Sequence, residues 1–255
     1  MHIQSIGRGP NISLIHGWAM HGGIFHELTE RLSERCRVHV IDLPGHGESR
    51  APESGFELQD LVDRLERLLP PSIWVGWSLG GLIAMRAAAA GSAALRGLAL
   101  IGASPRFVVD ADWPHAVPLA VFQQFHDDLQ SDYDAALERF LALEMHGDEN
   151  AQQGLRDLKA HIFERGRPDP AVLERGLALL ERTDLREQVS RIVVPNVWIA
   201  GSRDRLVPSP ALEWGARIAG GRFVSIAKAG HAPFLTHRAQ VLEALFALVT
   251  EVEVG

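Results

Sequence analysis

The chain has little cysteine and no long apolar run. Cys36 is the single cysteine among 255 residues, so no disulfide can form within the chain, and a reducing compartment is indicated. No apolar run approaches the roughly 20 residues of a membrane-spanning helix, because Arg86 and Glu243 interrupt the best candidates. The first residues lack the basic segment and apolar core of a signal peptide. The sequence therefore predicts a cytoplasmic protein that does not insert into a membrane.

The chain also lacks the positive charge and the ligand spacing that would indicate other classes of protein. Its formal net charge of −7 gives no attraction to a polyanion, so nucleic-acid binding is not predicted. The twelve histidines lack the spacing of a metal-ligand set, and we expect neither a metal nor another cofactor. A hydrophobic fraction of 46% is ample for the core of one large domain, and we expect a monomer.

Short apolar runs typical of strands alternate with longer runs typical of helices. The strand-like runs lie at about residues 2–6, 12–15, 38–43, 72–77, 95–102, 196–200 and 222–226. The helix-like runs lie at about residues 24–35, 58–69, 79–90, 207–219 and 238–250. This alternation predicts an α/β fold, in which helices cover both faces of a mostly parallel sheet.

The alternation is interrupted after residue 102, where more than ninety residues contain no strand-like run. A structureless loop of this length is rare within a compact domain. The segment instead carries helix-like runs at residues 117–129, 135–145, 151–163 and 171–182. We therefore expect residues 103–184 to form an inserted helical cap, and residues 1–102 and 185–255 to form the α/β core.

A Gly-x-Ser-x-Gly motif lies between a strand-like run and a helix-like run, in the segment Gly76-Trp77-Ser78-Leu79-Gly80. In this context the motif is typical of a nucleophile elbow, a tight strand–turn–helix junction with a strained serine backbone. Gly76 and Gly80 leave the space that the turn needs, and Ser78 lies at the positive end of the next helix. The motif predicts that Ser78 is a catalytic nucleophile.

A serine nucleophile needs a histidine base, and the histidine needs a carboxylate to orient it. After an elbow of this kind the acid follows the serine in the chain, and the histidine comes last. Asp204 and His231 each follow directly after a strand-like run, as Ser78 does. Because ligands bind at the carboxyl ends of the strands in open α/β sheets, the sequence predicts a Ser78–His231–Asp204 triad.

Three other residues satisfy this pattern only in part. Asp42 ends a strand-like run, but it precedes the serine, and the Leu-Pro-Gly-His-Gly that follows is typical of a structural turn. Asp184 lies in a helix-to-strand connection rather than at a strand end. His237 lies on the final helix and follows no strand.

Acyl transfer also needs backbone N–H groups that hold the oxyanion. One is expected from Leu79, the residue after the nucleophile, and one from the loop after an early strand. His16-Gly17-Trp18 forms that loop, and Gly17 permits a backbone geometry that aims the Trp18 N–H into the site. The sequence therefore predicts an oxyanion hole made by Trp18 and Leu79.

With these motifs the chain resembles the α/β-hydrolase superfamily over its whole length. More closely, it resembles the pimeloyl-[acyl-carrier protein] methyl ester esterases of biotin synthesis. The resembling segments are residues 14–18 (LIHGW), 42–45 (DLPG), 73–81 (IWVGWSLGG), 138–143 (ERFLAL) and 227–234 (AKAGHAPF). The cap segment 138–143 and Trp77 are the most informative, because caps differ between members of the superfamily.

The resemblance implies a carboxylesterase that removes the methyl group from a pimeloyl chain on acyl-carrier protein and releases methanol. It implies substrate contacts at Trp18, Ser78, Leu79, Phe140, Leu141, Ala142, Leu143, Glu144 and His231. It also implies that the acidic carrier protein docks on a basic edge of the cap made by Arg139, Arg156 and Lys159.

Two other classes of function remain open from the residues alone. A general short-chain carboxylesterase, a thioesterase, a perhydrolase or a carbon–carbon bond hydrolase would keep the same triad and differ in the cap. A non-catalytic binding protein on the same scaffold would normally have lost part of the triad. A dehalogenase is excluded, because its elbow carries a carboxylate where this chain has Ser78.

Overall fold

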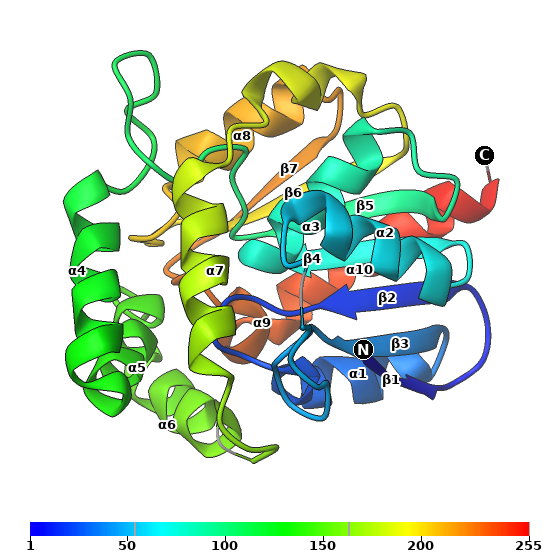
Figure 1. The fold of residues 1–255 in the computed structure, drawn as a ribbon. Helices are drawn as coiled ribbons and strands as arrows, with labels where there is room; N and C mark the ends of the chain where they lie inside the picture. Colours follow the sequence, from blue (N-terminus) through cyan, green and yellow to red (C-terminus); the bar gives the residue numbers. More distant parts are fainter. Residues whose placement is uncertain (54, 163, 255) are drawn as a thin grey trace.

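The seven strands form one sheet in the order β1-β3-β2-β4-β5-β6-β7 (Figure 1). The computed structural model describes residues 1–53, 55–162 and 164–254. The strands are β1 (His2–Ile6), β2 (Asn11–Ile15), β3 (Arg37–Asp42), β4 (Ser72–Trp77), β5 (Leu95–Ile101), β6 (Asn196–Gly201) and β7 (Arg222–Ile226). Only β1 runs antiparallel to its neighbour, so the predicted, mostly parallel sheet is confirmed.

The central strands are buried on both faces, which explains why they consist of continuous apolar runs. Every residue of β4 is buried, and so is every residue of β6. The edge strands β1 and β7 are instead partly exposed. In the centre of the sheet Ile15 pairs with Gly76 and Trp77 pairs with Ile101, so β2, β4 and β5 end together at one edge.

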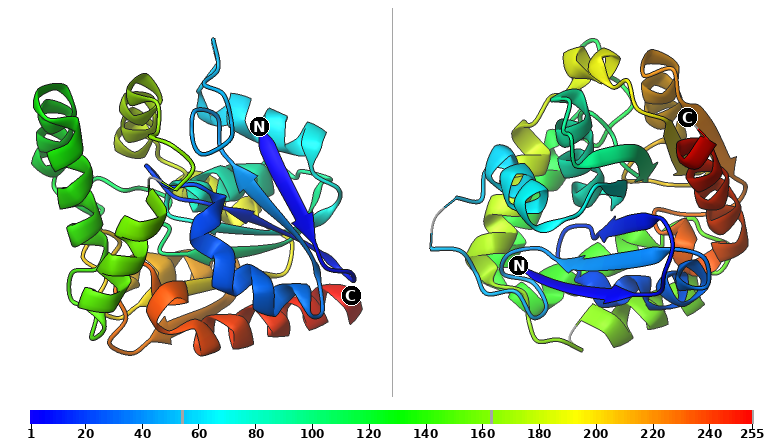
Figure 2. Two further views of the ribbon diagram at one scale, coloured as in Figure 1. Left: turned by 90° about the horizontal axis from the view of Figure 1, so that it is seen from below. Right: turned by 90° about the vertical axis from the view of Figure 1, so that its right-hand side faces the viewer.

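Helices cover the two faces of the sheet, as the alternating pattern predicts (Figure 2). The helices of the core are α1 (His26–Ser33), α2 (Leu58–Leu68), α3 (Leu79–Ala89), α8 (Ser209–Ile218) and α10 (Arg238–Val254), with the short helices η1 (Gly22–Phe25), η2 (Arg186–Arg191) and α9 (Pro233–Thr236). One layer contains α1 and α10, which contact each other. The other contains α2, α3, η2 and α8, with α3 packed directly on β4 and β5.

Four helices stand beyond the carboxyl ends of the parallel strands (Figure 1). They are α4 (Leu119–Ser131), α5 (Tyr133–Glu144), α6 (Ala151–Ile162) and α7 (Pro170–Arg182). These ranges are close to the expected ones. The expected end of the third helix, Phe163, lies outside the described residues. The two ends of this insertion meet, because Arg106 and Asp184 form an isolated antiparallel bridge. We propose on this ground that residues 103–184 form the cap, and 1–102 with 185–255 the core.

Local sequence signals explain where the cap helices begin. The Asp132 side chain caps α5 by accepting a hydrogen bond from the Ala135 N–H. Asp169 caps α7 in the same way, and Pro170 occupies the first helical position, where its missing N–H costs nothing. The buried face of α5 includes Phe140 and Leu141 and ends at Glu144, an acidic residue in an otherwise apolar row. Within the described chain, no helix is both long and apolar enough to cross a bilayer.

Candidate active site

Ser78 lies at the turn between β4 and α3, in a strained backbone conformation with φ 53° and ψ −116°. Its N–H donates to the Ile101 carbonyl oxygen at 3.0 Å, which ties the turn to β5. A side chain at Gly76 would collide with the Gly80 carbonyl, and one at Gly80 would collide with the Ile15 carbonyl. The turn is therefore possible only because these two positions lack a side chain.

Asp204 and His231 come together at the same edge of the sheet, after β6 and β7. The His231 Nδ1–H donates to Asp204 Oδ2 at 2.7 Å, and both side chains are buried. The other carboxylate oxygen of Asp204 accepts the N–H groups of Leu206 and Val207 at 2.8 and 2.9 Å. These three hydrogen bonds hold the carboxylate in one orientation, and the carboxylate in turn holds the tautomer of His231 with a proton on Nδ1.

The His231 ring also packs against the ends of β4 and β5. The Trp77 indole N–H donates to the His231 carbonyl oxygen at 3.0 Å, and the two rings lie 5.8 Å apart. A side chain at Gly102 would approach His231 Nδ1 to 3.0 Å, so this glycine makes room for the ring. His231 Nε2 is buried and has no hydrogen-bond partner among the described residues. This nitrogen is thus free to accept a proton, and the role of His231 as the base for Ser78 stays a prediction.

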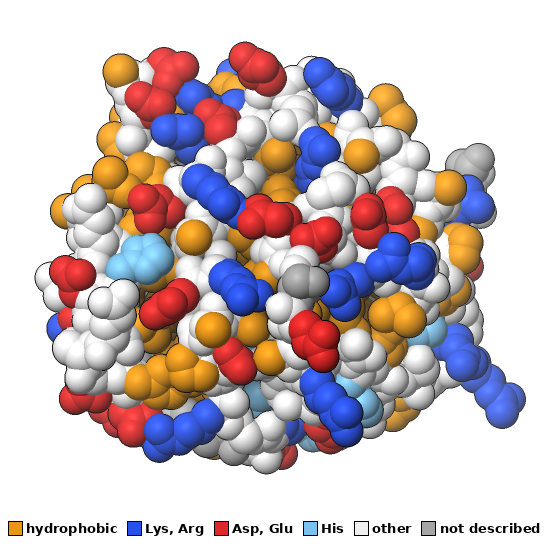
Figure 3. Space-filling model, in the orientation of Figure 1, with side chains coloured by type: hydrophobic (Ala, Val, Ile, Leu, Met, Phe, Trp, Pro, Cys, Tyr) orange, Lys and Arg blue, Asp and Glu red, His pale blue; other side chains and the backbone are white. Residues whose placement is uncertain are grey.

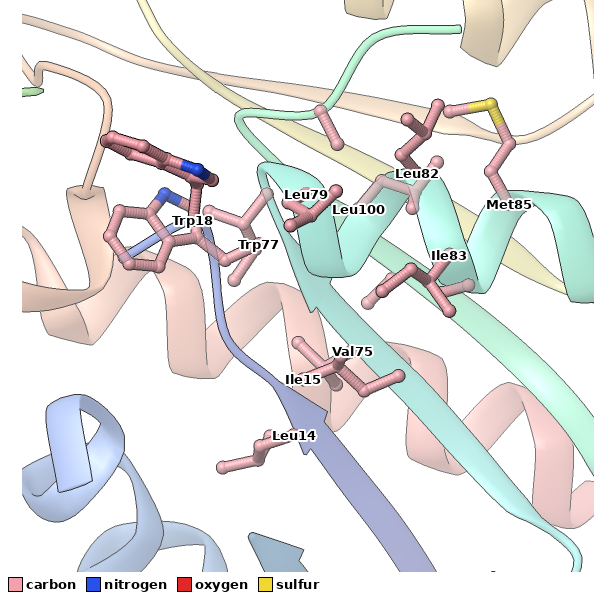
Figure 4. Close-up of a cluster of buried hydrophobic side chains, with 14 of the residues drawn as sticks. Leu14, Ile15, Trp18, Val75, Trp77, Leu79, Leu82, Ile83, Met85 and Leu100 are labelled. Atoms are coloured by element: carbon pink, nitrogen blue, oxygen red, sulfur yellow. The ribbon is translucent and has the colours of Figure 1, made fainter. Parts of the chain in front are cut away.

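The loop after β2 carries Trp18, which lies near Trp77 and Leu79, the two neighbours of Ser78 in the chain (Figure 4). A side chain at Gly17 would come within 3.2 Å of Ser78 Cβ. The His16 ring accepts the Leu43 N–H at Nε2 (2.9 Å), which leaves its Nδ1–H to donate to the Gly17 carbonyl oxygen at 2.8 Å. Since C=O and N–H point in opposite directions in a trans peptide, this bond turns the Trp18 N–H away from His16.

Burial, followed by the nearby His46 ring, lowers the pKa of His16 to about 3. His16 therefore stays neutral at physiological pH, as its acceptor role at Nε2 requires. Leu79, the other expected oxyanion donor, is the first residue of α3, where backbone N–H groups have no partner within the helix. The roles of Trp18 and Leu79 as oxyanion donors stay predictions.

An apolar cavity extends from Ser78 into the cap. Ser78 is its only polar lining residue in the described chain, and the others are Trp18, Phe107, Val117, Val121, Phe122, Phe125, Phe140, Leu177, Leu180 and Leu206. Trp18 joins core and cap here, since its ring meets Phe140 edge-on at 4.7 Å and its indole N–H donates to the Leu173 carbonyl oxygen at 2.8 Å. The site can therefore take an apolar acyl chain beside a serine nucleophile.

The cap residues expected at the substrate occupy different environments. Phe140 lines the cavity, and Leu141 is buried in the cap without lining it. Ala142 is exposed and Leu143 is half-buried, and neither lines the cavity. Most of the wall comes instead from α4, α7 and residues 107–117, which the sequence reasoning missed. The i, i+3 spacing of Phe122 with Phe125, and of Leu177 with Leu180, was visible, but ordinary core packing has the same spacing.

Glu144 is a fully buried carboxyl group at the end of α5. Neither carboxyl oxygen has a hydrogen-bond partner among the described residues. Burial raises the pKa of Glu144 well above its ordinary value, and the negative charge of Asp204 raises it further. The folded protein therefore holds the Glu144 proton to a higher pH than the unfolded chain does. The family resemblance implied that Glu144 contacts the substrate, whereas the structure places it in the interior, near Asp204.

The three alternative residues have other partners. Asp42 accepts the N–H groups of Gly22 and Glu48 at 2.7 and 3.0 Å, as a structural turn requires. Asp184 is bound by arginine side chains at the base of the cap, and His237 lies beside Glu149. Residues 1–53, 55–162 and 164–254 contain no cluster of His, Cys, Asp or Glu that could hold a metal ion.

Comparison with known proteins identifies relatives over nearly the whole chain. The model of the alpha/beta hydrolase family matches residues 14–244. A protein of Stenotrophomonas maltophilia (strain R551-3), named pimeloyl-[acyl-carrier protein] methyl ester esterase, is 49% identical over 246 residues, which cover 96% of this chain and 95% of that protein. A protein of the same name from Xanthomonas axonopodis pv. citri (strain 306) is 49% identical and matches 99% of this chain and 100% of its own length.

Solved structures with lower sequence identity share the fold. An esterase from Exiguobacterium antarcticum superimposes with a TM-score of 0.86 at 23% identity, covering 99% of this chain and 95% of that one. A bromoperoxidase from Bacillus anthracis superimposes with a TM-score of 0.87 at 22% identity, covering 97% and 94%. The names of these two structures differ, and at such identities the likeness concerns the fold alone.

We predict that Ser78→Ala abolishes ester hydrolysis while the protein stays folded. Loss of a serine nucleophile lowers kcat by about 10⁴-fold or more in enzymes of this type. Hydrolysis of a simple ester and labelling by a serine-reactive phosphonate, located by peptide mass spectrometry, measure the effect. Wild-type protein that resisted the phosphonate, or carried the label at another residue, would contradict the assignment.

We predict that Glu144→Gln stabilises the protein increasingly as the pH rises. Below the ordinary value of 4.5 the carboxyl group is protonated in both states, so it adds no pH dependence. Above 4.5 the unfolded chain releases the proton while the folded protein retains it, so the wild type loses about 1.4 kcal/mol of unfolding free energy per pH unit. The unfolding free energy of the wild type keeps falling until the pH reaches the raised pKa of Glu144 in the folded protein. A glutamine at this position does not ionise, so the variant does not lose unfolding free energy in this way.

Urea unfolding of both proteins at several pH values above 4.5 measures this difference. Glu138→Gln, on the exposed side of the same helix, is the matched control and should leave the difference near zero. A stability difference between Glu144→Gln and wild type that did not change with pH would show that Glu144 ionises normally in the folded protein.

Proposed function

The chain belongs to the alpha/beta hydrolase family and, within it, to the pimeloyl-[acyl-carrier protein] methyl ester esterases, and from this premise we propose that it hydrolyses the methyl ester of pimeloyl-[acyl-carrier protein]. The products are pimeloyl-[acyl-carrier protein] and methanol, and the enzyme is a serine carboxylesterase of biotin synthesis.

The observation that carries this proposal is the apolar cavity that begins at Ser78 and is lined mostly by residues of the cap. A methyl ester at the end of a hydrocarbon chain is neutral, so it enters such a cavity without losing strong contacts with water. The chain can lie against Phe125 and Phe140 while its ester carbonyl reaches Ser78. The carrier protein remains outside, joined to the far end of the chain.

Acylation starts when Ser78 Oγ attacks the ester carbonyl carbon and His231 Nε2 takes the hydroxyl proton. The carbonyl oxygen becomes an oxyanion, which the Trp18 and Leu79 N–H groups stabilise. The tetrahedral intermediate then collapses, the bond to the methoxy group breaks, and His231 gives its proton to the leaving methanol. The acyl group is now esterified to Ser78, and the hydrogen bond from His231 to Asp204 has stabilised the charged ring throughout.

Deacylation repeats these steps with water as the nucleophile. His231 takes a proton from the water, and the resulting hydroxide attacks the acyl carbon in the same oxyanion hole. The bond to Ser78 breaks, the serine recovers its proton from His231, and the product leaves with a free carboxylate. Because the cavity wall offers no cation in the described chain, the charged product is held less well than the neutral ester.

The carrier protein is proposed to dock at α5 and α6, where Arg139, Arg156 and Lys159 are exposed. Two of the three have acidic neighbours, since Arg139 pairs with Asp128 at 2.7 Å and Lys159 lies 3.5 Å from Glu138. Arg156 instead donates to an uncharged glutamine side chain. Acidic and basic side chains are mixed over the face that carries α4 and α7 (Figure 3), so docking rests on a local patch.

We also propose that the enzyme acts as a monomer in the cytoplasm. The proposed triad and the cavity are complete within one chain, so neither needs a second copy. The single cysteine is a buried free thiol, which suits a reducing compartment.

The substrate assignment is tested by comparing turnover of methyl-pimeloyl carrier protein with that of short-chain methyl esters. We expect kcat/KM for the carrier-bound ester to be at least about 100-fold higher, because the apolar cavity and the docking patch both contribute to its binding. Equal or lower values for the carrier-bound ester would identify a general short-chain carboxylesterase instead.

We predict that Arg156→Glu and Lys159→Glu lower kcat/KM for the carrier-bound ester by about three- to tenfold at low salt, with less effect at high salt. Steering by exposed charges acts on association and is screened within ~10 Å at 0.1 M salt. Turnover of a small free methyl ester should not change. Arg96→Glu, at the amino end of β5 and exposed, is the control. Equal losses on both substrates would indicate a role in cap stability, and no loss would exclude docking through these charges.

A further inference from the structure

The loop that carries His231 is hydrogen bonded to the cap. The His231 N–H donates to the Glu144 carbonyl oxygen at 3.1 Å, and the Gly230 N–H donates to Asp148 Oδ2 at 2.7 Å. In the opposite direction, the Glu149 N–H donates to the Lys228 carbonyl oxygen at 3.1 Å. The turn between α5 and α6 is therefore attached to the His231 loop by these three backbone N–H hydrogen bonds, and the Lys228 and Glu149 side chains add an ion pair at 2.9 Å.

Among these three hydrogen bonds only the one to Gly230 is accepted by a side chain, that of Asp148, and its carboxylate is fully buried. Besides Gly230, Oδ2 accepts the Thr236 hydroxyl at 2.8 Å, at the end of α9. Oδ1 accepts the Asn150 N–H at 2.7 Å, a local bond of a kind common in turns. His237 Nδ1 lies 3.8 Å from Oδ2. Oδ1 thus accepts a hydrogen bond from the cap turn itself. Oδ2 accepts hydrogen bonds from residues on both sides of His231, Gly230 before it and Thr236 after it.

The orientation of the His231 ring depends on this backbone. At its Nδ1 the ring is held by Asp204, but Nε2 has no partner among the described residues. The direction in which Nε2 points is therefore set by Asp204 and by the position of the loop backbone. Burying a carboxylate costs desolvation free energy unless hydrogen-bond donors surround it. A buried aspartate used only to anchor a loop would therefore be unfavourable, which suggests that the loop it holds has a further function. Misplacing a catalytic group by about 1 Å can cost about 100-fold in rate.

We propose that Asp148 is a positioning residue of the esterase, which holds the His231 loop from the cap through the Gly230 N–H and the Thr236 hydroxyl. The inference rests on the triad mechanism proposed above, but not on the identity of the ester. Nothing in the motifs of the chain marks Asp148, because its partners lie 82 and 88 residues further along.

The test is the steady-state hydrolysis of p-nitrophenyl acetate together with the rate of phosphonate labelling at Ser78. For Asp148→Asn we expect kcat to fall about 10- to 100-fold while KM stays within about twofold. Phosphonate labelling should slow in parallel, because it needs the same base but no deacylation. Asp157→Asn, on α6, is the matched control and should keep the activity of the wild type, because its carboxylate accepts a hydrogen bond from Gln153 of the same helix and is not part of the contacts to the His231 loop. Asp148→Asn with normal kcat and labelling but a lower Tm would overturn the proposal.

Substitutions of Thr236 keep the test decisive if Asp148→Asn does not fold. Thr236→Val keeps the methyl group, which lies near Gly154, but loses the hydroxyl, whereas Thr236→Ser keeps the hydroxyl and loses the methyl group. We expect kcat to fall about three- to tenfold in the valine variant and to stay within about twofold of wild type in the serine variant. The reverse order would show that only packing matters here.

The hydroxyl of Thr236 also meets His237 Nδ1 at 2.8 Å, so the effect of the valine has two sources. A double-mutant cycle separates them, because Asp148→Asn and Thr236→Val should be clearly non-additive in kcat only if both act through the same hydrogen bond. Additive effects would overturn the proposed path. Activity on p-nitrophenyl acetate without activity on the carrier-bound ester would overturn the proposed substrate and leave the test of Asp148 intact.

Discussion

No side chain fits where α3 crosses the ends of β2 and β4, and the rest of the site depends on this close approach. Gly76 and Gly80 bring the helix to within backbone contact of the two strands. The turn between β4 and α3 then has room for only one strained residue, Ser78, and the loop at Gly17 comes to lie directly beside it. The Cα atom of Ser78 and the backbone N–H groups predicted to hold the oxyanion are thereby placed by the main chain.

Three buried acidic residues at the boundary of core and cap differ in the number of hydrogen-bond donors around them. Asp204 and Asp148 each accept three hydrogen bonds from backbone or hydroxyl donors and from His231. Glu144 has no such donor among the described residues, and its pKa is raised, first by burial and then by the charge of Asp204. Donors around a buried carboxyl group thus differ sharply between neighbouring residues.

The sequence predicted most of the core and only part of the site, for a physical reason. Parallel strands buried on both faces consist of continuous apolar runs, so all seven strands were predicted to within a residue or two. Strand ends then indicated Asp204 and His231, which prove to be hydrogen bonded to each other, although their catalytic roles stay predictions. Glu144 was expected only as a substrate contact, and Asp148 was not identified at all, because contacts across more than eighty residues leave no periodic signal.

Trp18 has consequences for the modularity of such enzymes. Its backbone belongs to the loop beside the nucleophile, while its indole N–H is bonded to Leu173 and its ring packs on Phe140, both from the cap. A cap transplanted from another hydrolase would have to supply an acceptor for this indole and a ring against it. Exchange of whole caps is therefore a poor route to new specificity in this scaffold. Redesign of the acyl-chain specificity is better confined to cavity residues such as Val121 and Leu180, whose apolar side chains line the cavity and form no hydrogen bonds.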